Sequence, residues 1–307
     1  MDRDLLSHVP VVIAVARRGG FAAAAAELNT SPSNVSHAVR AVEKRLGMPL
    51  FARTTRSVSL TEAGETFVRA ATGAMQGINS AWEAVQSQRT GAAGLLRINT
   101  SRIAYGWFLK HVLEKMAVDY PDVTVELFFD DGLSDIVGQG FDAGIRLGHM
   151  VAEDMIAVPL AGPFRVIVVA SPDYLAERGT PTSVRELREH RCIQYRMTSA
   201  GNVYLWELRD GKRDVEVETR GPVIVNDMIV ALDLARSGYG LCYTFEPLAR
   251  DDLESGALVE VLPKASHRQP GMSCYYPRRA SDSPKLRAFV DSAKAVFASR
   301  ARGGTAH

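Results

Sequence analysis

The sequence contains little cysteine, and its cysteines are not placed to pair with one another. There are three in 307 residues, the number is odd, and no two form a CxxC pair. They are Cys192, Cys242 and Cys274. This usage argues against a disulfide framework or a structural zinc site, and it is typical of proteins from a reducing compartment.

Long apolar runs are also missing. The apolar stretch 9–16 near the start is too short to cross a bilayer, and it continues into Arg17 and Arg18. The first four residues lack the cationic segment that opens a signal peptide. We therefore expect no signal peptide, no membrane segment and a cytoplasmic protein.

The common catalytic motifs do not occur. The sequence has no Walker loop, GxGxxG, HExxH or GxSxG, and its seven histidines are not spaced as metal ligands. These absences predict a protein that is not an enzyme and that needs neither a metal nor a cofactor.

The composition is that of an ordinary globular protein, with 46% hydrophobic and 23% charged residues. A length of 307 residues favours about two domains. The net charge is only +1, yet residues 1–60 carry eight Lys or Arg against four acids. This asymmetry indicates one basic domain for a polyanion and a second domain for another ligand.

Residues 1–60 have the pattern of three short helices. The first has apolar residues on one helical face and ends at Gly19-Gly20. The second is the alanine-rich segment 21–28. Ser31 is a good N-cap for the third helix because Pro32 follows it, and Gly47 is placed to end that helix after Leu46.

The third helix has two distinct faces, one apolar and one polar. The apolar residues that we expect to face the core are Val35, Val39, Val42 and Leu46. The polar residues on the other side are Ser33, Ser36, His37, Arg40 and Lys44. Hydroxyls near the start of a helix and long cations further along suit the base edges and phosphates of DNA. In an isolated helix, the same face would more simply be a solvated surface.

Residues 61–89 form one long helical pattern. Thr61 can cap it, and an apolar seam close to a heptad repeat runs from Ala63 to Val85. A single helix of this length cannot bury such a seam on itself, so it needs either the next domain or a second copy of the chain. We favour the second copy, because the small residues Gly73, Ala74 and Gly77 allow close approach.

A hinge at 90–94 separates this helix from an alternation of strands and helices. Strands are expected at 95–99, 123–129, 143–146, 164–170 and 241–245, and helices at 103–120, 133–138 and 228–237. This order predicts an α/β domain with a parallel sheet covered by helices.

The stretch from Leu46 to Gly64 fits the pattern LGxPLFxRTxRxVxLTxAG. Together with the two helices before it, this stretch closely resembles the winged helix-turn-helix of LysR-type transcriptional regulators. The pattern is far more specific than a generic helix-turn-helix, and the resemblance extends in length and order over essentially all 307 residues. It implies a transcriptional regulator whose binding to promoter DNA is modulated by a small-molecule effector.

The resemblance implies a domain division and a set of partners. An all-α winged helix-turn-helix would span 1–60, a linker helix for dimerisation 61–89, and an effector-binding domain 90–300. The last would have two α/β subdomains, as in periplasmic solute-binding proteins, at about 92–161 with 267–298 and at about 162–266. The implied partners are an interrupted inverted repeat in duplex promoter DNA, further copies of the chain in a dimer or tetramer, an effector, and RNA polymerase.

The resemblance also assigns DNA-binding positions. The recognition-helix positions are Pro32, Ser33, Ser36, His37 and Arg40, and the wing positions are Arg53, Thr54 and Arg56. Two positions depart from the family pattern, since Pro32 replaces a common polar residue and His37 a common arginine. Because a neutral imidazole offers fewer donors than a guanidinium, we expect the operator to differ at that base step.

Effector-binding positions follow from the rule that ligands of open α/β sheets bind beyond the carboxyl ends of strands. The residues that this rule selects are Thr100, Ser101, Arg102, Asp131, Arg146, Tyr195, Asn226, Asp227 and Thr244. The hydroxyls could take a carboxylate, with Arg146 as its charge clamp. A structural ion pair of Arg146 with Asp131 or Asp142 is an equal alternative, and Asn226-Asp227 fit a helix cap better than a ligand contact.

Overall fold

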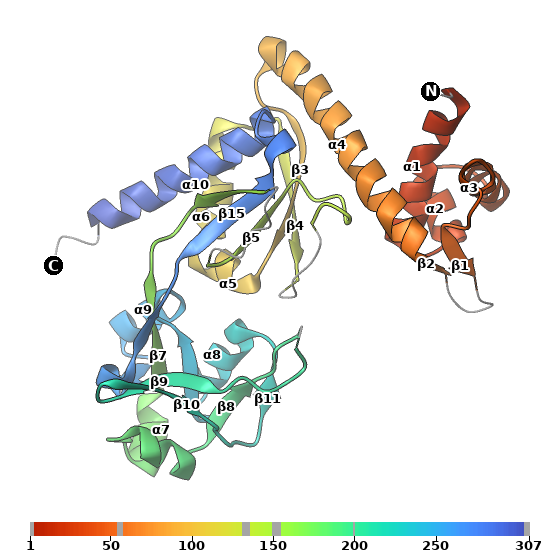
Figure 1. The fold of residues 1–307 in the computed structure, drawn as a ribbon. Helices are drawn as coiled ribbons and strands as arrows, with labels where there is room; N and C mark the ends of the chain where they lie inside the picture. The colour runs from red at the N-terminus through yellow and green to blue at the C-terminus, as the bar shows by residue number, and fades with distance from the viewer. Residues whose placement is uncertain (1–2, 54–57, 131–135, 149–154, 199, 304–307) are drawn as a thin grey trace. The chain divides into compact units, whose positions relative to one another are not determined.

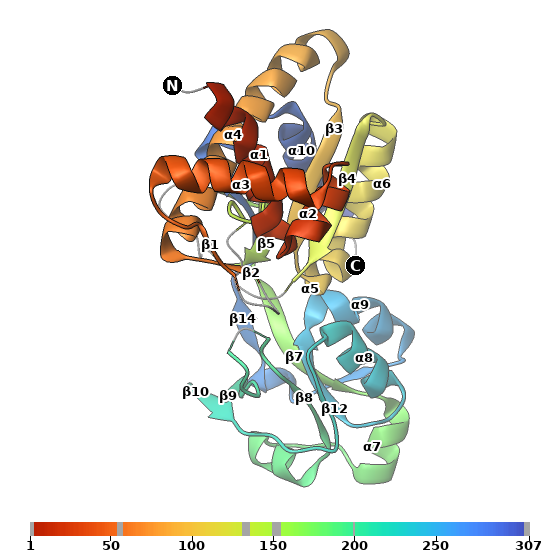
Figure 2. The ribbon, with the colours of Figure 1, turned by 90° about the vertical axis from the view of Figure 1, so that its right-hand side faces the viewer.

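A computed structural model describes residues 3–53, 58–130, 136–148, 155–198 and 200–303. Two compact units account for the chain. The first comprises residues 1–91 with the segments 135–142 and 279–284, and the second comprises the remainder. Each unit is considered by itself (Figures 1 and 2).

The first unit contains the three expected helices, α1 (Arg3–Arg18), α2 (Phe21–Glu27) and α3 (Pro32–Leu46). Ser31 caps α3 as predicted, because its hydroxyl accepts from the backbone N–H of Asn34 at 3.1 Å. Gly47 ends the helix in the left-handed region, with φ of 73°. α3 packs on both α1 and α2 around one apolar cluster (Figure 2).

One expected core residue of α3 lies at the surface. Val35, Val39 and Val42 are buried as predicted, whereas Leu46 is 39% exposed. Leu46 is the last residue of the helix. The chain turns away at Gly47, so the core covers the apolar face only as far as Val42.

A short antiparallel ribbon follows α3, formed by β1 (Phe51–Arg53) and β2 (Val58–Leu60). The carboxylate of Glu43 in α3 accepts from the backbone N–H groups of Leu50 and Phe51, at 2.9 and 3.3 Å. Leu50 and Phe51 are buried in the helical core. The ribbon is therefore fixed to α3 by a side-chain bond and by packing.

The long helix α4 spans Glu62–Thr90, close to the predicted 61–89. Thr61 caps it, because its Oγ1 accepts from the N–H of Gly64 at 3.0 Å and donates to the carbonyl of Pro49 at 2.8 Å. Val68, in the N-terminal half, joins the core of the three helices. Further along, Ile78, Trp82 and Val85 are 63%, 68% and 66% exposed.

The second unit contains a five-stranded sheet in the order β4-β3-β5-β15-β6. Its strands are β3 (Gly94–Thr100), β4 (Val123–Phe129), β5 (Ala143–Leu147), β6 (Met155–Pro159) and β15 (Met272–Pro277). Its helices are α5 (Arg102–Ala104), a π-helical turn (Tyr105–Leu109), α6 (Lys110–Asp119) and α10 (Pro284–Gly303).

A six-stranded sheet completes this unit, in the order β11-β8-β12-β7-β13 with β14 also paired to β7. Its strands are β7 (Phe164–Ala170), β8 (Cys192–Tyr195), β11 (Ile224–Val225), β12 (Leu241–Phe245), β13 (Val259–Val261) and β14 (His267–Gln269). A separate hairpin joins β9 (Trp206–Asp210) to β10 (Arg213–Val217). The helices here are α7 (Pro172–Arg178), α8 (Met228–Arg236) and α9 (Glu246–Ser255).

The prediction of an α/β fold is confirmed, but the prediction of parallel sheets is only partly correct. β3 is parallel to β4 and β5, whereas β15 is antiparallel to both β5 and β6. β7 is antiparallel to β12, β13 and β14. The chain returns late to the first sheet, and that return strand, β15, runs against its neighbours.

The predicted helix at 133–138 is not found where it can be assessed. Residues 136–140 form a turn, closed by a bond from the N–H of Phe141 to the carbonyl of Ile136 at 2.8 Å. Residues 133–135 lie outside the described residues. Ile136 and Phe141, at the two ends of this turn, are buried.

Among the described residues, no single helix is both long and apolar enough to cross a membrane, and only the bent pair Leu6–Arg18 and Phe21–Glu27 meets that test together.

Gly64 has no room for a side chain. A Cβ there would lie 2.0 Å from the carbonyl oxygen of Leu50, whereas a Cβ at Gly77 of the same helix would have its nearest neighbour at 4.0 Å. We predict that Gly64→Ala lowers the free energy of unfolding by about 1–3 kcal/mol through overpacking. Gly77→Ala should raise it by up to about 1 kcal/mol through helix propensity. Urea unfolding followed by circular dichroism compares the two, and equal effects would contradict the prediction.

Candidate nucleic-acid interface and effector site

The polar face of α3 is open to solvent. Ser33, His37, Arg40 and Lys44 are exposed, and Ser36 is half-buried. Pro32, also exposed, is the first residue of the helix and contributes no backbone donor. The buried valines fix the rotation of the helix, so these side chains project from one face of a rigid element.

Some basic side chains of the first unit are already engaged in ion pairs. Arg17 and Arg18, at the end of α1, both form ion pairs with Glu27 of α2. These two cations are therefore used to hold α1 against α2. Two of the eight basic residues of 1–60 are therefore engaged in ion pairs, whereas Arg40 and Lys44 of α3 are exposed.

The structure describes only part of the predicted wing. Arg53 is the last residue of β1, but its side chain is not described. Thr54 and Arg56 lie outside the described residues. β1 and β2 pair from Phe51↔Leu60 to Arg53↔Val58, and we call the Arg53 end of this ribbon the ribbon tip.

The carboxyl end of β3 places several polar groups in a buried position. Thr100 is fully buried, and its hydroxyl has no hydrogen-bond partner among the described residues. Asn99 is also fully buried, and its side-chain amide nitrogen has no hydrogen-bond partner among the described residues. Ser101 uses its hydroxyl to cap α5, accepting from the N–H of Ala104 at 3.3 Å. Two donors without partners thus lie at the end of this strand.

Arg146 contacts the backbone at the ends of two strands. Its guanidinium donates to the carbonyls of Asp130 at 2.7 Å and Ile145 at 2.8 Å, and it also bonds the side-chain oxygen of Asn99. The ion pair that the sequence suggested with Asp131 cannot be assessed, because Asp131 lies outside the described residues. In this structure, Arg146 ties β5 to the ends of β3 and β4.

Arg102 and Asp227 lie together, although they come from different sheets. Arg102 Nε is 3.1 Å from Asp227 Oδ2. The other oxygen of Asp227 caps α8, accepting from the N–H of Ile229 at 2.8 Å, so the prediction of a cap is confirmed. Gly106 of the π-helical turn also faces Ile229 and Leu248. The segment that follows β3, α5 with the π-helical turn, therefore packs against α8 and α9.

The remaining predicted effector residues are less closely grouped. Thr244, in β12, is fully buried, and its hydroxyl has no partner among the described residues. Tyr195, the last residue of β8, packs against the apolar cluster beneath α8. Asn226 is exposed.

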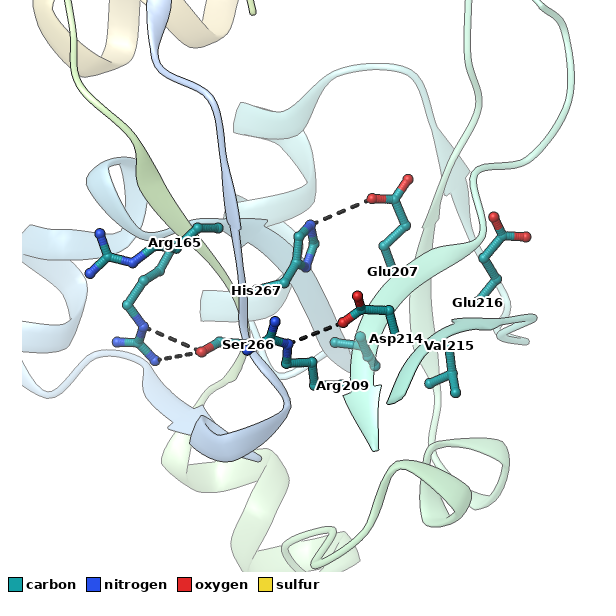
Figure 3. Close-up of a pocket in the computed structure, with 10 residues that line it drawn as sticks. Arg165, Glu207, Arg209, Asp214, Val215, Glu216, Ser266 and His267 are labelled. Atoms are coloured by element: carbon teal, nitrogen blue, oxygen red, sulfur yellow. Dashed lines mark hydrogen bonds and ion pairs between the residues drawn. The ribbon is translucent and has the colours of Figure 1, made fainter. Parts of the chain in front are cut away.

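An open hollow of about 720 Å³, which the sequence analysis missed, lies beside the β9–β10 hairpin (Figure 3). Arg209 bonds Asp214 at 3.1 Å on its wall, and His267 lies 3.5 Å from Glu207. None of the predicted effector residues lines it. Arg209 and Asp214 compensate one another, so this pair offers an incoming ligand little net electrostatic attraction.

Tyr204 and Glu207 form a polar link near this hollow. The tyrosine hydroxyl donates to the carboxylate at 2.7 Å. Burial, together with this carboxylate, raises the pKa of Tyr204. The phenol is therefore a neutral donor at physiological pH. Tyr204 is half-buried, and this geometry fits a structural role.

The three cysteines are free thiols inside the second unit. Burial raises the pKa of Cys192, Cys242 and Cys274 to about 12 in each case. Since the thiolate is the reactive form, these side chains are poorly suited to redox chemistry in the folded protein. Within the described ranges, no three His, Cys, Asp or Glu side chains are placed to hold a metal ion.

The fold and these two sites define a class of protein. One unit presents a polar helix on a helix-turn-helix, and the other places polar groups at the ends of strands in two sheets. A family model described as a bacterial regulatory helix-turn-helix protein of the lysR family matches residues 6–65. A second, described as the LysR substrate binding domain, matches residues 89–298.

The chain belongs to the LysR family of DNA-binding transcriptional regulators. It is 38% identical to YcaN, an uncharacterized HTH-type transcriptional regulator of Escherichia coli K12, over 94% of each chain. It is also 38% identical to a putative transcriptional regulator of Pseudomonas aeruginosa PAO1, over 98% of this chain and 96% of the relative. CrgA of Neisseria meningitidis has a similar structure, with a TM-score of 0.62 and 25% identity over 94% of this chain and 98% of that one.

The contacts of Arg146 lead to a prediction about stability. Arg146→Ala removes the guanidinium bonds to the carbonyls of Asn99, Asp130 and Ile145, so we expect a loss of about 1–3 kcal/mol in the free energy of unfolding. Arg188→Ala, which removes an exposed cation of the second unit, is the matched control. Urea unfolding measures both, and an unchanged midpoint for Arg146→Ala would favour its role as a ligand clamp alone.

Proposed function

We propose that this regulator binds promoter DNA as a dimer through α3 and the ribbon tip, and that a small effector acts on the second unit. The division into residues 1–60, 61–89 and 90–300 is part of this proposal. So are regulation by binding without catalysis, action in the cytoplasm and contact with RNA polymerase. The observation that carries the proposal is the polar face of α3, held outward by buried Val35, Val39 and Val42.

The proposed DNA contacts divide by chemistry. Ser33, Ser36 and His37 are short enough to approach base edges from the start of a helix laid in the major groove. Arg40 is longer and positioned to neutralise a phosphate or to donate twice to guanine. Arg53, Thr54 and Arg56 would reach the backbone and the minor groove from the ribbon tip. The exposed apolar residues Ile78, Trp82 and Val85 of α4 support pairing with a second copy.

DNA binding is tested with Arg40→Ala on a duplex that the full-length wild type selects from a random library. We expect weaker binding and a salt dependence reduced by about one phosphate contact. Arg188→Ala removes the same charge from an exposed position in the second unit and should change neither. Fluorescence anisotropy across a salt series measures affinity and slope, and a wild-type slope for Arg40→Ala would rule out the assignment.

The proposed effector site lies where the end of β3 packs against α8. The groups left without partners, on Asn99, Thr100 and Thr244, are donors or hydroxyls, so a ligand rich in acceptors would satisfy them. Arg102 and Asp227 already form an ion pair there. A carboxylate that competes for Arg102 would weaken this pair and change the packing of β3 on α8. Ser101, Arg146, Tyr195, Asn226 and Asp131 complete the proposed set.

The effector site is tested with Thr244→Val, which keeps the shape and removes the unpartnered hydroxyl. Since no hydrogen bond is lost, we expect the unliganded protein to be no less stable. Thermal shifts of the full chain with a panel of small carboxylic and amino acids should then be smaller than in the wild type. Thr219→Val also removes a buried hydroxyl without a described partner and is the control. Equal shifts in both variants would exclude Thr244 from the site.

A further inference from the structure

The space beside Gly73 of α4 is filled by a side chain, which the sequence did not indicate. The guanidinium of Arg279 lies directly over it, and a Cβ at Gly73 would be 2.8 Å from Arg279 Nη2. A Cβ at Gly77, one turn later, would lie 4.0 Å from the Cδ of the same arginine, which is ordinary van der Waals contact. The glycine that was expected to admit a partner helix therefore accommodates a side chain of the same unit.

Gln76 connects two chain segments at this point. Its Oε1 accepts from Arg279 Nη2 at 3.1 Å, and its Nε2 donates to the carbonyl of Phe141 at 3.2 Å. Both ends of a single amide are thus used. The two bonds hold this turn of α4 to both segments at once, so a movement of α4 relative to either segment changes the bond to it.

The two segments held by Gln76 lead into neighbouring strands. Phe141 precedes the start of β5 by two residues, and Arg279 follows the end of β15 by two. β5 and β15 are paired antiparallel, with Arg146 opposite Ser273. Arg146 in turn bonds the backbone at the ends of β3 and β4, next to the proposed effector site. A continuous set of bonded elements therefore runs from that site to Gln76.

These contacts use a different face of α4 from the exposed apolar one. At about 100° per residue, Gly73 and Gln76 fall on the opposite side of the helix from Ile78, Trp82 and Val85. The same helix thus presents one face to Arg279 and leaves the other open for a second copy. A change at the first face can alter the helix without disturbing the residues of the second.

We propose that Gln76 and Arg279 are positioning residues that set the rotation of the linker helix according to the state of strands β5 and β15. The inference rests on the proposed function, since it explains how the second unit would control α4, the long helix that is joined to α3 through the ribbon. Effector binding that shifts the end of β5 would move the carbonyl of Phe141 relative to Arg279. Gln76 cannot follow both, so α4 must turn or lose a bond.

The contact itself is tested by hydrogen exchange of the full chain, followed over the amides of residues 72–80. We expect Arg279→Ala, Gln76→Ala and Gly73→Ala to raise exchange about 2- to 10-fold, the effect of losing one hydrogen bond. The controls are Arg278→Ala, which removes the adjacent exposed arginine, and Gly77→Ala, which adds the same methyl group one turn away. Unchanged exchange in the first three variants would overturn the inference.

The positioning role is tested on the duplex selected by the wild type. Arg279→Ala should change the bend of the bound DNA, measured by circular permutation, without changing the salt slope, because the phosphate contacts of α3 remain. Arg278→Ala should alter neither. A wild-type bend in Arg279→Ala would reduce the contact to a structural one. If the wild type selects no duplex, the proposed function fails, while the exchange experiment still decides the contact.

Discussion

The junction between the ribbon and α4 is the constraint on which the first unit depends. Thr61 accepts from Gly64 and donates to Pro49, and its own N–H bonds the carbonyl of Leu50 at 3.0 Å. The oxygen of the same carbonyl would lie only 2.0 Å from a Cβ at residue 64. The start of the long helix is therefore held against the end of the turn after α3, and only glycine permits this approach.

This junction explains why the motif from Leu46 to Gly64 is so specific. Gly47 ends α3 in a conformation that side chains disfavour, Leu50 is buried, Thr61 caps α4 and Gly64 allows contact. Each position has a separate physical reason, and together they fix the direction in which α4 leaves the helices. The motif mainly describes this joint, and the recognition-helix positions proposed to contact DNA precede it in the chain.

Sequence reasoning succeeded where the determinants are local. The N-cap at Ser31, the end at Gly47, the cap at Thr61 and the strand Val123–Phe129 all follow from residues within a few positions of one another. It failed where the partner is distant in the chain. The antiparallel return of β15 and the arginine over Gly73 depend on residues more than 100 positions away, which no local pattern reports.

At the candidate effector site too, the sequence alone could not show which polar groups are already hydrogen-bonded. Sequence rules identified strand ends, and polar groups are found there. They could not tell that Arg146 is engaged with backbone carbonyls, or that Thr100 and Thr244 are the hydroxyls left without a described partner. Residue type sets which bonds a side chain can make, but burial and neighbours decide which are already made. For a regulator this distinction matters, since a group that ties strands together transmits a change in their spacing, whereas only an unsatisfied group gains a bond when a ligand arrives.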